Sequence, residues 1–83
     1  MDRKQYELVS KLHNELINDL GIEADKYERE DAFFGIIFDI EKGIDMKEAF
    51  IKAFGLVYDV EVPDVIYNSR YALCKGWKWR LDK

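Results

Sequence analysis

The chain has 83 residues, one cysteine and a formal net charge of −4 at pH 7. This length fits a single domain over residues 1–83, and a hydrophobic content of 48% predicts a folded core rather than a disordered chain. One cysteine excludes an internal disulfide framework and a cysteine-rich zinc site. The first residues lack the apolar run of a secretory signal, and no segment approaches the ~20 apolar residues of a membrane span. We therefore expect a cytoplasmic protein with no membrane partner.

The charge is divided unevenly along the chain. Residues 1–69 carry 8 Lys and Arg against 16 Asp and Glu, whereas residues 70–83 carry 5 Lys and Arg against 1 Asp. An acidic body repels the phosphates of nucleic acid, which argues against general nucleic-acid binding. The same body attracts a partner with a basic surface.

Apolar residues recur at spacings of three and four in four segments, as on one face of a helix. The predicted helices cover residues 3–20, 26–42, 46–57 and 64–75. An aspartate suited to a helix N-cap precedes each of the first three, and Pro63 precedes the fourth, where a helix start tolerates proline. The pattern predicts a mainly α fold, a compact bundle of about four helices.

The first segment contains the only histidine, His13, one turn after Ser10. A serine and a histidine at this spacing can touch, as a nucleophile and its base do. His13, however, belongs to the apolar stripe, so we interpret it as a core residue. The chain also lacks metal-ligand and phosphate-loop motifs. We therefore expect no catalytic residue, no metal and no cofactor, and a protein that is not an enzyme.

The second segment is apolar around most of its circumference, which predicts the central helix of the bundle. Only a narrow polar stripe remains, formed by Glu28, Asp31, Gly35, Asp39 and Lys42. A glycine inside a helix favours close approach by another backbone, from this chain or from a partner. An incidental glycine is the alternative interpretation of Gly35.

Two stretches near the C-terminus alternate apolar and charged residues, a spacing typical of a half-buried strand. They are residues 58–62 and 77–82. Side by side, they would place Asp59 and Glu61 opposite Lys78 and Arg80. A small two-stranded element is therefore an open addition to the bundle, and α+β is the alternative fold class.

The same C-terminal stretch supports an alternative function. Trp77 and Trp79 have indole rings that can stack on bases, and Lys78 and Arg80 can neutralise phosphate. These residues would make the chain a nucleic-acid-binding accessory protein. The alternation favours a structural role for both tryptophans, so this function is the second hypothesis.

A small chain without catalytic residues is expected to act by binding. The predicted partner-binding site lies on the second segment and at its start: Asp25, Glu28, Glu30, Asp31, Gly35 and Asp39. We predict a small acidic module that docks this helical face on a basic protein, such as a nucleic-acid-processing enzyme. In size and charge it is comparable with inhibitors carried by phages and mobile elements and with immunity proteins, an analogy that assigns no family. Monomer and homodimer are both open, and a homo-oligomer follows if the second helix is exposed.

Overall fold

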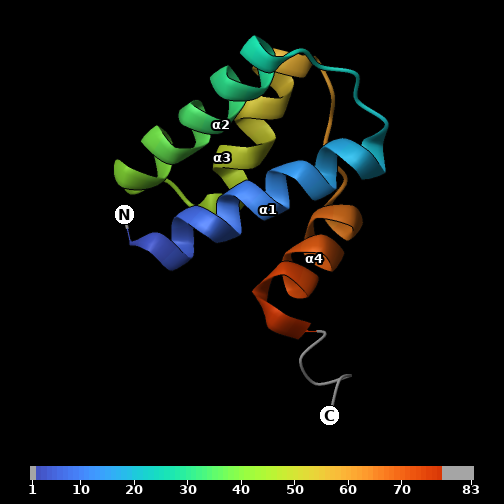
Figure 1. Ribbon diagram of the computed structural model, residues 1–83. Coiled ribbons are helices and arrows are strands. Elements are labelled where there is room, and N and C mark those ends of the chain that lie inside the picture. Colours follow the sequence, from blue (N-terminus) through green and yellow to red (C-terminus); the bar gives the residue numbers. More distant parts are fainter. Residues whose placement is uncertain (1, 78–83) are drawn as a thin grey trace.

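The computed structural model describes the backbone of residues 2–77 and the side chains of residues 2–75 (Figure 1). These residues form four α-helices and two π-helical turns. The elements are α1 (Arg3–Leu20), α2 (Lys26–Glu41), α3 (Met46–Ala53), η1 (Phe54–Tyr58), α4 (Asp64–Ala72) and η2 (Leu73–Trp77). The predicted mainly α bundle is confirmed, and each predicted helix has its counterpart within a few residues.

The predicted strand over residues 58–62 is wrong, because helical hydrogen bonding continues into this stretch. Tyr58 ends η1, and the backbone N–H groups of Asp59 and Val60 both donate to the carbonyl oxygen of Phe54. Asp59 then turns the chain with a left-handed φ of 55°, a conformation that aspartate tolerates better than most residues. No strand occurs between residues 2 and 77; Trp77 ends η2, and the rest of the second predicted strand, 78–82, lies outside the described residues.

The helix ends follow the capping residues of the sequence. The side chain of Asp2 accepts from the backbone N–H of Gln5 at 2.8 Å, and Asp25 and Glu28 form a reciprocal capping box. Asp45 caps α3 through the N–H of Lys47 at 3.2 Å. Gly21 closes α1 in the left-handed conformation, with a φ of 64°. These caps confirm where the first three helices begin.

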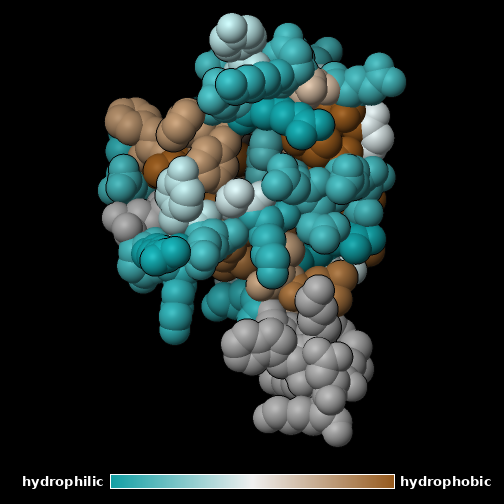
Figure 2. All heavy atoms as spheres, viewed as in Figure 1, coloured by the Kyte–Doolittle hydropathy of each residue, from teal (hydrophilic) through white to brown (hydrophobic). Residues whose placement is uncertain are grey.

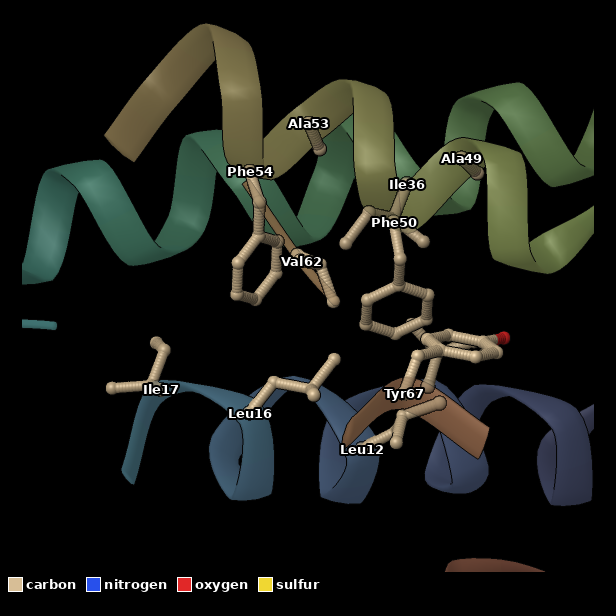
Figure 3. Close-up of a cluster of buried hydrophobic side chains, with 11 residues drawn as sticks. Leu12, Leu16, Ile17, Ile36, Ala49, Phe50, Ala53, Phe54, Val62 and Tyr67 are labelled. Atoms are coloured by element: carbon tan, nitrogen blue, oxygen red, sulfur yellow. The ribbon is translucent and has the colours of Figure 1, made fainter. Parts of the chain in front are cut away.

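In Figure 1, α1 lies between the α2–α3 pair and α4. Figure 3 shows that side chains of α1 point across the core toward Phe50 of α3 and Phe54 of η1. Leu12 and Leu16 of α1 are fully buried there, as are both phenylalanines. Tyr67 of α4 completes this layer, with its ring 5.8 Å from that of Phe50. The main buried layer therefore lies between α1 and the α3–η1 segment.

Ion pairs hold α4 in place at the surface. Arg70 of α4 donates from Nε to a carboxylate oxygen of Asp19 and lies 4.0 Å from Glu15, both on α1. Lys47 of α3 pairs with Asp64 at the start of α4, at 3.1 Å. Some of the carboxylates of the chain are thus neutralised by ion pairs within the fold.

The buried layer predicts a large stability difference between two leucines. Leu16→Ala removes fully buried methyl groups and leaves a cavity, so we expect the free energy of unfolding to fall by about 2–5 kcal/mol. Leu56→Ala is the matched control, because that side chain is 76% exposed and its loss should change stability by less than ~0.5 kcal/mol. Urea unfolding of both variants measures the difference. Equal losses would contradict the position of the core.

Candidate protein-binding surface

Aromatic side chains form an exposed stripe along α2. Tyr27, Phe34 and Phe38 are 77%, 57% and 59% exposed. Their separations of seven and four residues place them on one face of the helix. Figure 2 shows a light-brown, hydrophobic area over the C-terminal half of α2. We call Tyr27, Phe34 and Phe38 the aromatic stripe.

The stripe is exposed because the core contacts only the opposite side of α2. Ala32 and Ile36 are fully buried on that side, and Phe33 is half-buried with its ring 5.1 Å from that of Tyr6 on α1. Because these residues face α1 and α3, the helical spacing places Phe34 and Phe38 on the solvent side of α2. The expectation that α2 is the central helix is therefore wrong: α2 is a surface helix with two apolar faces.

The predicted acidic residues fall into three different environments. Asp25 and Glu28 bond to each other's backbone N–H groups, at 2.9 and 3.1 Å, and thereby cap α2. Asp39 is 9% exposed and lies 3.7 Å from Nζ of Lys52 on α3. Glu30 and Asp31 are exposed beside the aromatic stripe. Of the four exposed acids, Glu30 and Asp31 are the two that do not cap α2.

Gly35 lies among these residues, between Phe34 and the next turn of the helix. A Cβ atom added at Gly35 would meet nothing within 4 Å, so none of the described residues brings its backbone close to it. An interior helical glycine costs roughly 1 kcal/mol relative to alanine. Within the fold, nothing compensates for that cost, which leaves a notch in the surface next to Phe34.

Sequence reasoning missed the aromatic stripe itself. It assigned Phe34 and Phe38 to the core, because apolar residues surround the helix and periodicity does not tell which face is covered. One signal was available: a bundle of this size cannot bury every face of a 16-residue helix. The small side chain of Ala32, together with Ile36, marks the face that packs closely against the neighbouring helices.

His13 is a core residue, as predicted, and is only 3% exposed. Its Nε2 atom and the hydroxyl group of Tyr58 share a hydrogen bond of 2.9 Å, whose donor depends on the tautomer of the ring. Burial, together with the smaller effect of the nearby charge of Arg29, lowers the pKa of His13 from 6.5 to about 4. Burial also raises the pKa of Tyr58 to about 12. The pair is therefore uncharged at neutral pH.

A shallow hollow of about 280 Å³ lies between α1 and the first half of α2. Its lining joins the His13 region to the aromatic stripe and consists of Tyr6, Ser10, His13, Asn14, Arg29, Glu30, Phe33 and Phe34. The hollow is large enough for one side chain. It extends the exposed face of α2 toward α1.

Other predicted features have the following positions. Cys74 is half-buried and packs against the hydrophobic core. Of the alternative nucleic-acid site, Trp77 is the last residue of η2, and Lys78, Trp79 and Arg80 lie outside the described part of the chain. Across residues 2–77, no three His, Cys, Asp or Glu side chains are grouped to hold a metal ion, and no helix has the length and apolar character to cross a bilayer.

Comparison of the chain with models of protein families, with curated proteins and with solved structures finds no match in any of the three. The candidate surface is therefore defined by the geometry of α2 alone.

The capping box predicts a structural role for Asp25. Asp25→Ala should lower the free energy of unfolding by about 1 kcal/mol, because it removes the acceptor for the N–H of Glu28. Asp25→Asn keeps an equally good cap without the charge and should leave stability within ~0.5 kcal/mol of the natural protein. Urea unfolding separates the two. Equal losses would show that the charge matters and the cap does not.

The buried histidine predicts a dependence of stability on pH. The unfolded chain protonates His13 near pH 6.5, whereas the folded chain does so only near pH 4, so stability falls as the pH falls through this window. From these two values we expect a loss of about 2 kcal/mol between pH 7 and pH 5. Urea unfolding of the natural protein and of His13→Gln at both pH values measures it. The same loss in both proteins would contradict the assignment to His13.

Proposed function

We propose that the protein is a non-enzymatic, cytoplasmic binding module that docks the outer face of α2 on a basic partner protein. The observation that carries this proposal is the exposure of Glu30 and Asp31 beside the aromatic stripe. Apolar patches of this kind on small proteins commonly mark interaction sites. Acidic residues at their edge select a partner of opposite charge.

The charge distribution supports a basic partner. The chain carries a net charge of −4, and the fold neutralises Asp19 and Asp39 through Arg70 and Lys52. Glu30 and Asp31 form no such ion pair with another side chain of residues 2–75. Their charge is available to steer a basic surface toward α2. A nucleic-acid-binding groove of an enzyme has this chemistry, and an inhibitor or immunity-type protein that occupies such a groove is one form of the proposal.

A charge-reversal experiment tests the proposal. The immobilised protein is used to capture partners from an extract of the producing organism at low and at high salt. We expect a specific protein at low salt, with about tenfold less recovered at high salt because exposed charges are screened. The double variant Glu30→Lys, Asp31→Lys should lose this protein even at low salt.

The control variant carries the same change of net charge away from α2. Glu48→Lys, Glu61→Lys reverses two exposed carboxylates on α3 and in the segment before α4. It should retain the captured protein. Loss of binding in both double variants would show a dependence on net charge alone, and retention in both would remove the α2 face from the proposal.

A further inference from the structure

We infer that the outer face of α2 receives a basic amphipathic α-helix of the partner, which crosses α2 at Gly35. This inference rests on the proposed function and specifies the chemistry of the partner: leucine-like residues on one side of a helix, bordered by Lys or Arg. Three features of α2 carry it: the length of the aromatic stripe, the notch at Gly35 and the position of the acidic side chains.

The aromatic stripe has the dimensions of a helix–helix contact. Tyr27 and Phe38 are eleven positions apart, which corresponds to about 16 Å along a helix axis. Three turns of a partner helix span the same distance. Aromatic side chains that are more than half exposed are also the residue types that most often anchor protein interfaces. The stripe therefore offers an elongated apolar contact that suits one side of a helix better than an isolated side chain.

Gly35 supplies a place for close approach. Helices pack with their axes 8–10 Å apart, and a residue without a side chain at the crossing point allows the shorter distances. The space around the Cβ position of Gly35 is open, and Phe34 and Phe38 are its exposed neighbours. A partner side chain can occupy this notch with its backbone close to α2. The closer contact with the partner would then offset the loss of helix stability that Gly35 causes.

The charges beside the stripe set the sign of the charge on the partner helix. Glu30 and Asp31 are exposed near the N-terminal half of the stripe. At the other end, Nζ of Lys42 lies 4.6 Å from the centre of the Phe38 ring. The exposed Glu41 and Lys42 at this end carry opposite charges, so the net negative charge that a partner helix meets lies beside Glu30 and Asp31. The cationic residues of the partner helix are expected to lie beside Glu30 and Asp31. A second copy of this acidic protein would bring more carboxylates than cations to that position, so a basic partner fits better.

Two synthetic peptides of the same charge test this partner class. The first is a Leu/Lys peptide of about 14 residues that forms an amphipathic helix, and the second replaces each Leu by Gln. Backbone amide chemical shifts of the full chain are followed by NMR during titration with each peptide. We expect shifts centred on α2 with the Leu/Lys peptide, and at least tenfold weaker binding of the Gln/Lys peptide.

Three variants assign the contact to its parts. Phe34→Ala, Phe38→Ala should weaken binding of the Leu/Lys peptide at least tenfold, whereas Leu56→Ala, which removes exposed apolar surface elsewhere, should not. Gly35→Gln fills the notch with a better helix former in open space, so its melting temperature should equal or exceed that of the natural protein. We expect Gly35→Gln to bind the peptide about tenfold more weakly despite its unimpaired fold.

The other outcomes overturn the inference. Equal binding of both peptides would mean that the face recognises charge alone, which leaves the proposed function intact. Shifts centred elsewhere, or no binding of the Leu/Lys peptide, would exclude a basic helix as the occupant. A dimer of the free protein in sedimentation that Phe34→Ala, Phe38→Ala abolishes would identify the occupant as a second copy. The proposed function fails separately, if charge reversal at Glu30 and Asp31 leaves the captured partner bound.

Discussion

The arrangement of the protein depends on one buried layer, in which Leu12 and Leu16 of α1 meet Phe50 and Phe54 (Figure 3). A chain of 83 residues is too small to cover every apolar side chain with a second layer. Aromatic rings of α3, η1 and α4 all enter the one buried layer. α2 packs against this layer through Ala32 and Ile36, with Phe33, Ile37 and Ile40 half-buried beside them, and its outer aromatic residues remain at the surface. The candidate surface is thus a consequence of how the core is filled.

The π-helical turn η1 links that core to the buried histidine. A π turn carries more residues per turn than an α-helix, so it shifts the side chains that follow it. Here it places Phe54 with its ring 5.6 Å from that of His13, and Tyr58 within hydrogen-bond distance of Nε2. A buried imidazole costs less when a hydrogen bond satisfies its polar atom. The turn therefore lets the chain bury a polar residue on the face where α1, α2 and η1 meet.

Local signals in the sequence predicted the parts of the fold that depend on local interactions. The aspartate caps and the spacing of apolar residues located four helices and placed His13 in the core, because these features act within a few residues of one another. The alternation of residues 58–62 led to the wrong prediction of a strand. The same spacing of two arises here because Val62 is buried in the core although it belongs to an irregular segment. Which face of α2 is covered depends on contacts with α1 and α3, so Phe34 and Phe38 could not be assigned from periodicity.

The acidic residues show why a count of charges does not define a binding surface. Asp25 and Glu28 bond to backbone at the start of α2, Asp19 and Glu15 hold Arg70, and Asp39 faces Lys52. Each of these carboxylates already bonds or pairs within the chain, and a partner that engaged it would have to compete with an existing interaction. Within the described part of the chain, Glu30 and Asp31 form no such bond or ion pair, and they lie beside exposed apolar surface. A partner that bound there would remove water from the aromatic rings without breaking a contact between described residues that holds the helices together.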